Sequence, residues 1–86
     1  MMKKFKVWWP KDGETEEDAV ILESYSDHVG DVASEYDYYY RDGWRQGSEE
    51  YEEVYFKEVD GDGTIYKVTT WLEFSIDFCG GFPEKL

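Results

Sequence analysis

The fold class is decided by residues 28 to 41, His28-Val-Gly-Asp-Val-Ala-Ser-Glu-Tyr-Asp-Tyr-Tyr-Tyr-Arg41. Within this stretch apolar side chains recur every three or four residues, as they do along one face of an α-helix. Ser26 or Asp27 can cap the first turn, and Gly43 can end the last one. The pattern therefore predicts one helix over about 28 to 41. Its apolar stripe consists of Val29, Val32, Ala33, Tyr36 and Tyr40.

On either side of this helix, apolar and polar residues alternate, which is typical of β-strands. The last alternating segment is long for a single strand, so we expect a bulge or bend near Thr70. The segment from Cys79 to the C-terminus contains Gly and Pro and is predicted to be a loose tail. The predicted strands are residues 3 to 9, 19 to 25, 50 to 59 and 64 to 78.

The order of elements is therefore strand, strand, helix, strand, strand, and 86 residues correspond to one domain, residues 1 to 86. We predict an α+β fold, in which an antiparallel sheet of about four strands carries one helix on one face (ββαββ). The residues expected in the shared core include Val32, Tyr36, Val68, Leu72, Phe74 and Ile76.

Acidic side chains dominate the middle of the chain. Residues 12 to 62 hold 18 of the 21 Asp and Glu residues but only three of the nine Lys and Arg residues, a formal charge of −15, and the whole chain carries −12. The 4 Trp, 8 Tyr and 5 Phe residues argue for a folded domain rather than a disordered acidic tail. A field of this sign repels nucleic acid and attracts basic proteins, so we expect no direct binding to nucleic acid.

The cellular compartment is indicated by two simple features. Cys79 is the only cysteine, which excludes an intrachain disulfide and fits a reducing cytoplasm. No run of residues approaches the ~20 apolar residues of a membrane span. We expect a cytoplasmic protein with no membrane partner.

Residues that could catalyse a reaction form no convincing group. Cys79 and His28 are each alone in their type, which is too few for a transition-metal site, and a thiol–imidazole pair would need the fold to bring them together. The carboxylates Glu14, Glu16, Glu17 and Asp18 lie in a polar loop, where we expect them to be solvated rather than to form an acid–base pair. The prediction is a protein without enzymatic activity and without a cofactor.

Residues 58 to 69 begin like the calcium-binding loop of an EF-hand. Acidic residues stand at the first, third and fifth positions, and Gly63 stands at the sixth. The twelfth position, where that loop needs a bidentate Glu, is Thr69. Because the flanking residues have the pattern of strands, we expect a hairpin turn, and a calcium-binding domain is an alternative.

A surface that binds a partner protein is the function favoured by the charge and the aromatic residues. Asp27, Asp31 and Glu35 recur every four residues, which places their carboxylates along one side of the helix. Such a row can imitate a phosphate backbone, and exposed aromatic residues, Trp8 among them, would add contact area. The alternative is an ordinary solubilising exterior. The predicted partner-binding residues are Asp27, Asp31, Glu35, Asp37, Tyr38, Trp44, Glu49, Glu50, Tyr51, Glu52 and Glu53.

Residues 5 to 19 are Phe5-Lys-Val-Trp-Trp-Pro-Lys-Asp-Gly-Glu-Thr-Glu-Glu-Asp-Ala19. With the acidic helix and the Glu-Tyr strand that follow, this opening resembles a group of small acidic proteins from phages and prophages. In size and charge, the chain also resembles phage inhibitors of host defence, including anti-CRISPR proteins and other DNA mimics. The resemblance implies that the chain covers the basic nucleic-acid-binding surface of a host protein or complex. A structural or self-associating phage domain, possible as a homodimer, is the alternative.

Overall fold

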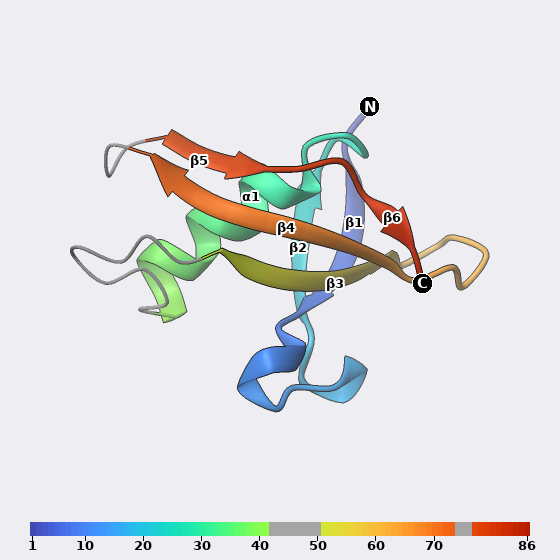
Figure 1. Ribbon diagram of the computed structural model, residues 1–86. Helices are drawn as coiled ribbons and strands as arrows, with labels where there is room; N and C mark the ends of the chain where they lie inside the picture. The colour runs from blue at the N-terminus through green and yellow to red at the C-terminus, as the bar shows by residue number, and fades with distance from the viewer. Residues whose placement is uncertain (42–50, 74–76) are drawn as a thin grey trace.

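The computed structural model describes residues 1–41, 51–73 and 77–86, and Figure 1 shows its architecture. Within these ranges one curled antiparallel sheet has the strand order β2-β1-β3-β4-β5, and a short strand, β6, also pairs with β4. One helix, α1 (Val29–Tyr36), packs against β4 and β5 and reaches β2. The predicted α+β class is confirmed. The strands are β1 (Lys3–Trp8), β2 (Val20–Ser24), β3 (Glu52–Glu58), β4 (Tyr66–Glu73), β5 (Asp77–Gly80) and β6 (Glu84–Lys85).

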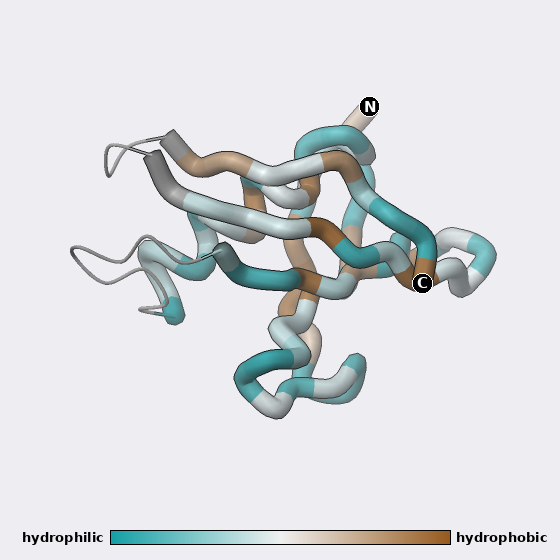
Figure 2. Tube along the Cα trace, viewed as in Figure 1, coloured by the Kyte–Doolittle hydropathy of each residue, from teal (hydrophilic) through white to brown (hydrophobic). Residues whose placement is uncertain are grey.

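The first two strands pair as an antiparallel hairpin. β1 ends at Trp8, just before Pro10, which has no N–H to donate to a sheet. The connection contains two 3-10 turns, and Thr15 and Asp18 cap the second by reciprocal hydrogen bonds. Gly13 ends the first turn with φ of 80°, a conformation that glycine adopts without strain. This connection projects from the sheet in Figure 1 and is largely hydrophilic in Figure 2.

The prediction of one long strand over residues 64 to 78 is wrong. β4 ends at Glu73, and β5 begins at Asp77 and runs back alongside β4. Thr70 is not a bend but a regular β4 position, opposite Glu52 of β3 and Gly80 of β5. Phe74, Ile76 and the side chain of Leu72, all expected in the core, lie outside the residues that the structure describes.

The prediction of a loose C-terminal tail is also wrong. Cys79 and Gly80 belong to β5, and Lys85 of β6 pairs with Tyr66 of β4. The last residue is held too, because the backbone N–H of Leu86 donates to the carbonyl of Ile65 at 3.0 Å. The chain thus returns to the sheet after Gly81 instead of leaving it.

The helical segment begins at Val29, as predicted, and its last part changes geometry. After Tyr36 it continues as a π-helical turn, Asp37–Arg41, and Gly43, the expected end, lies outside the described residues. A π-helical turn is wider than an α-helical turn, so the side chains that follow leave the α-helical stripe. Tyr40, predicted to join the apolar stripe, is therefore 76% exposed.

Gly30 lies where the helix crosses the sheet most closely. A Cβ atom built on Gly80 of β5 would lie 2.6 Å from the Cα of Gly30, and one built on Gly30 would lie 2.9 Å from the Cα of Gly80. The two backbones meet because neither residue has a side chain. This contact fixes α1 across β5 and accounts for a glycine within a helix.

The core lies between α1 and the concave face of the sheet. Trp8, which was expected to be exposed, is instead buried on the other side of β1, with its ring 6.1 Å from that of Tyr55. No helix in the described part of the chain is long and apolar enough to cross a membrane. The buried core consists of Phe5, Val7, Trp9, Val29, Ala33, Val54, Phe56 and Val68, with Tyr36 packed against it.

Candidate functional site

Three carboxylates follow α1 on its exposed side, at the spacing that the sequence indicates. Asp27 precedes the helix with its side chain 84% exposed, and Asp31 and Glu35 follow at successive turns. His28 Nδ1 lies 3.2 Å from Asp31 Oδ2, and His28 Nε2 lies 3.7 Å from Asp27 Oδ1. Glu35 forms no ion pair with any residue that the structure describes. We call Asp27, Asp31 and Glu35 the acidic row.

A groove of about 460 Å³ opens between α1 and β2, and Glu35 belongs both to this groove and to the acidic row. The rings of Tyr36 and Tyr40 lie 5.0 Å apart along it. Tyr39 and Tyr40 are 63% and 76% exposed, which is unusual for side chains of this size. We call this feature the tyrosine groove. Its lining consists of Leu22, Val32, Glu35, Tyr36, Tyr39 and Tyr40.

Tyr38, predicted as a partner-binding residue, is half-buried instead. Its ring lies 5.5 Å from that of Phe78 of β5 and 5.0 Å from that of Tyr39. The exposed tyrosines of this segment are therefore Tyr39 and Tyr40. Sequence reasoning missed both because it assigned Tyr40 to the core and did not consider a π-helical turn.

Arg41 is the centre of a charge cluster that the sequence analysis missed. Its Nη2 lies 2.7 Å from Asp12 Oδ2, and its Nη1 lies 2.5 Å from Glu14 Oε2. Its Nε lies 3.1 Å from Asp37 Oδ1, and the guanidinium stacks 3.9 Å from the centroid of the Trp9 ring. Burial alone would lower the pKa of Arg41, but the neighbouring carboxylates outweigh it and raise that pKa. The cluster joins the β1–β2 connection to the helical segment, so Glu14 is not the solvated residue that was expected.

Asp37 and Glu52, both predicted to contact a partner, face the interior of the protein. Asp37 is 1% exposed, and its Oδ2 has no hydrogen-bond partner among the described residues. Glu52 is half-buried, at the start of the strand whose Val54 and Phe56 enter the core. Burial and the neighbouring charge of Asp37 raise the pKa of Glu52 to about 8. Burial also raises the pKa of Asp37. Because both side chains face inward, Asp37 and Glu52 are removed from the candidate surface.

The other predicted partner-binding residues lie around the start of β3. Tyr51 is exposed with its ring 5.8 Å from that of Trp71, and Glu53 is half-exposed. Both line a small cleft of about 190 Å³ with Trp9, Lys11, Asp12 and Glu52. Trp44, Glu49 and Glu50 lie outside the residues that the structure describes.

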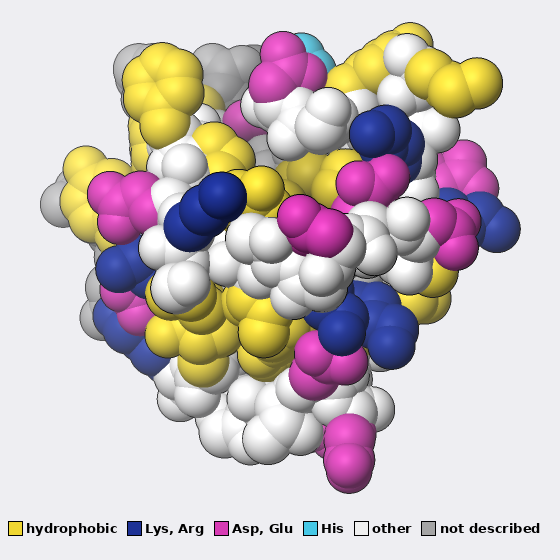
Figure 3. All heavy atoms as spheres, turned by 90° about the vertical axis from the view of Figure 1, so that its right-hand side faces the viewer, with side chains coloured by type: hydrophobic (Ala, Val, Ile, Leu, Met, Phe, Trp, Pro, Cys, Tyr) yellow, Lys and Arg dark blue, Asp and Glu magenta, His cyan; other side chains and the backbone are white. Residues whose placement is uncertain are grey.

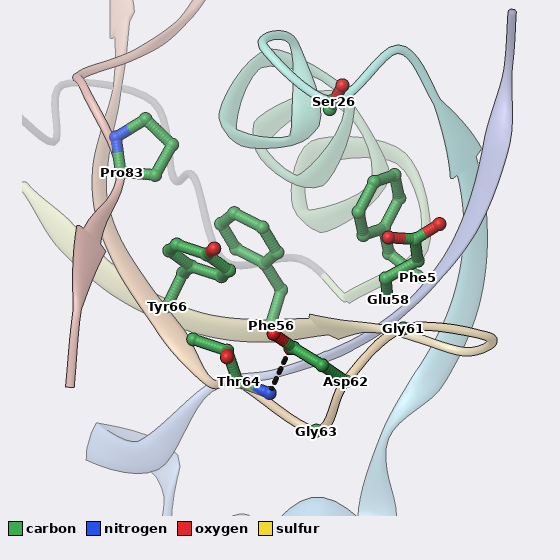
Figure 4. Close-up of a pocket in the computed structure, with 10 residues that line it drawn as sticks. All are labelled: Phe5, Ser26, Phe56, Glu58, Gly61, Asp62, Gly63, Thr64, Tyr66 and Pro83. Carbon is green, nitrogen blue, oxygen red and sulfur yellow. Dashed lines mark hydrogen bonds between the residues drawn. The ribbon is translucent and has the colours of Figure 1, made fainter.

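The calcium-like segment is the connection between β3 and β4, as the hairpin interpretation predicts. Figure 4 shows Asp62 turned toward Thr64, whose backbone N–H donates to Asp62 Oδ1 at 2.9 Å. This hydrogen bond and the Thr64 hydroxyl lower the pKa of Asp62. The connection borders a cleft of about 490 Å³ with aromatic side chains, Phe5, Phe56 and Tyr66, along its floor. Among the described residues, no three His, Cys, Asp or Glu side chains are placed to hold a metal ion.

Charges on the face shown in Figure 3 are mixed, with Lys and Arg side chains beside Asp and Glu side chains. Lys57 lies 2.9 Å from Glu16, and Lys3 lies 3.3 Å from Glu58. Paired charges of this kind cancel at a distance. The acidic row differs from them, because His28 is the one basic side chain that pairs with it in the part of the chain that the structure describes. It is therefore the described surface best placed to project a negative field.

Comparison with known proteins returned no matching family model, no matching curated protein and no matching solved structure.

Proposed function

We propose that this chain is a non-enzymatic binding protein that covers a basic, nucleic-acid-binding surface of a partner protein. The observation that carries the proposal is the position of Glu35, a carboxylate with no ion pair among the described residues, which the acidic row and the tyrosine groove share. A partner with Lys or Arg side chains beside an apolar residue would match both features at once. Charge would guide the encounter, and the exposed tyrosines would hold the complex.

The distribution of basic residues supports this proposal. Most of the described Lys and Arg side chains lie in ion pairs with particular carboxylates. The negative charge of the remaining carboxylates is therefore offset by few nearby cations. A negative surface of this kind accelerates association with a basic partner and disfavours nucleic acid as a ligand. The cations in pairs with carboxylates are Lys3, Lys6, Arg41, Lys57 and Lys67.

The Arg41 cluster supports a structural role for the acids that lie away from the acidic row. Its guanidinium already contacts three carboxylates and stacks on Trp9, which leaves little room for a substrate group. We therefore assign it to holding the β1–β2 connection in place and not to catalysis. The binding role would be carried out in the cytoplasm of a host cell, and nucleoprotein complexes of host defence are the first partners to test.

The test is capture of partners from a nuclease-treated bacterial lysate, with and without added DNA. We expect a basic protein that the wild-type chain retains and that DNA displaces. Asp31→Lys with Glu35→Lys should abolish capture, because the change reverses two charges of the acidic row. Glu17→Lys with Asp60→Lys is the matched control, since it changes the net charge equally at two exposed positions outside that row. Equal loss of capture by both double variants would reject a specific role for the row.

A further inference from the structure

The free edge of the sheet lies beside the tyrosine groove. β2 is the terminal strand of the order β2-β1-β3-β4-β5, so one side of its backbone has no neighbouring strand among the described residues. Ile21 is 52% exposed and Glu23 is exposed, while Leu22 between them turns toward the groove. An unpaired strand edge of this kind is a template for another strand.

The hydrogen-bond pattern shows which β2 residues point outward. The N–H of Val59 donates to the carbonyl of Lys4 at 3.0 Å, so Lys4 bonds toward β3. Successive residues of a strand bond to opposite sides, so the next residue, Phe5, bonds toward β2 and its partner there, Leu22. The backbone N–H and C=O groups of Ile21 and Glu23 must then point away from the sheet. No backbone hydrogen bond outside the regular ladders uses these groups in the described part of the chain.

We propose that this edge and the tyrosine groove together bind an extended, basic segment of the partner protein as an added strand. The proposal rests on the proposed function and specifies how the partner is held. Backbone groups of the segment would pair with those of Ile21 and Glu23. Alternate side chains of the segment would point to the side of the sheet that α1 covers. These side chains would be apolar and would enter the tyrosine groove beside Leu22. On the other side, the intervening side chains would be Lys or Arg beside Glu23.

Charge complementarity selects a basic segment over a second copy of this chain. Pairing of two β2 edges would bring together two chains of −12 each, and a register that sets Glu23 opposite Glu23 would place like charges side by side. Charged side chains on edge strands commonly prevent this kind of self-pairing. Lys4 and Lys6 of β1 stand opposite Glu23 and Ile21, but the chain as a whole carries −12. A segment with alternating Lys and apolar residues therefore meets a net opposite charge and places its apolar side chains in the tyrosine groove.

The test uses a synthetic heptapeptide, acetyl-Lys-Val-Lys-Phe-Lys-Val-Lys-amide, and two N-methylated forms of it. In an added strand that runs antiparallel to β2, residues opposite Ile21 and Glu23 share their face of the sheet and direct their N–H groups at β2, so in the bound register these are the Lys residues. N-methylation of the Lys residues should therefore weaken binding by roughly tenfold or more, because each methyl group removes a donor and blocks approach. N-methylation of the Val and Phe residues should change affinity by less than about threefold, because those N–H groups point away from β2.

Two variants of the protein complete the experiment. Ile21→Pro removes an outward N–H that the β1–β2 ladder does not use, so the protein should stay folded and lose the peptide. Ile21→Thr keeps that N–H and should retain binding. Binding by the wild-type chain should also protect the amides of Ile21 and Glu23 from hydrogen exchange. Equal affinities of the two methylated peptides, no binding of the unmodified peptide, or dimerisation through β2 would each overturn the added-strand proposal. Loss of lysate capture in Asp31→Lys with Glu35→Lys would still support the proposed function in that case.

Discussion

Replacement of Glu52 by Gln should make this protein more stable at alkaline pH. In the folded state the Glu52 carboxyl lies in a partly buried site beside the carboxyl of Asp37, which is 1% exposed. Burial and that neighbouring charge raise the pKa of Glu52 from 4.5 to about 8. Gln has the same shape as a protonated Glu and cannot ionise, so Glu52→Gln removes the repulsion while it keeps the packing.

The sign of the effect follows from proton binding. Between the unfolded value of 4.5 and the folded value of about 8, the folded state holds a proton that the unfolded state has released. The stability that this proton provides is complete below the lower value and is lost as pH rises through the upper one. At 1.36 kcal/mol for each pH unit, the shift corresponds to at most about 5 kcal/mol. Because water and small movements relieve part of the repulsion in a half-buried site, we expect about 2–3 kcal/mol.

The assay is urea unfolding, followed by tryptophan fluorescence, at a series of pH values. Glu52→Gln should be within about 0.5 kcal/mol of the wild type near pH 5, and more stable by about 2–3 kcal/mol near pH 9. Glu53→Gln is the matched control, because it removes the same charge from the neighbouring, half-exposed position on the other side of β3. If the two variants gain the same stability between these pH values, net charge and not the buried pair sets the pH dependence, and the reasoning fails.

Three further outcomes follow from the fold. Gly80→Ala should destabilise the protein by about 1–3 kcal/mol, because its methyl group meets the Gly30 backbone, whereas Gly81→Ala has ordinary contact distances and should cost little in thermal melts. Arg41→Lys should cost about 1–2 kcal/mol in urea unfolding, since an ammonium group cannot contact three carboxylates and also stack on an aromatic ring. Calcium should raise the melting temperature no more than magnesium does at equal ionic strength, and a shift seen with calcium alone would contradict a simple turn at residues 59–65.

The parts of the fold that were predictable from sequence are those governed by local patterns. Alternation located β1 and β3, the short apolar run Val20-Ile-Leu22 located β2, and apolar spacing located the start of α1. The same alternation concealed the β4–β5 hairpin, because apolar residues keep one phase from Tyr66 to Phe78 with Thr70 as the one polar exception. In both strands of this hairpin the apolar residues of this phase fall at even-numbered positions, and the sequence between the strands has no Gly, Pro or Asn to signal a turn. The pattern is therefore the same as that of a single long strand.

The sequence predicted the exposed side chains of the candidate site only on the regular α-helix, where residues three or four apart share a face. Asp27, Asp31 and Glu35 follow the helix at the predicted spacing, whereas Asp37 is buried, because a π-helical turn changes which side chains face inward. Arg41 meets Asp12 across 29 residues of sequence, and only the tertiary fold brings them together. The position of Glu52 had a local signal, since it shares a strand face with Val54 and Phe56, but its acidic character suggested exposure.

Competition for the captured partner tests the central claim most directly. The partner would be bound to a fluorescent DNA or RNA duplex and titrated with this protein, with anisotropy reporting release of the duplex. We predict complete displacement of the duplex at about 0.05 M salt, and a directly measured affinity for the partner that weakens by roughly tenfold or more as salt rises to about 0.3 M, because screening shortens the reach of the acidic row. Asp31→Lys with Glu35→Lys should displace nothing. A complex that holds this protein and the duplex together, with an affinity that salt does not change, would contradict the account.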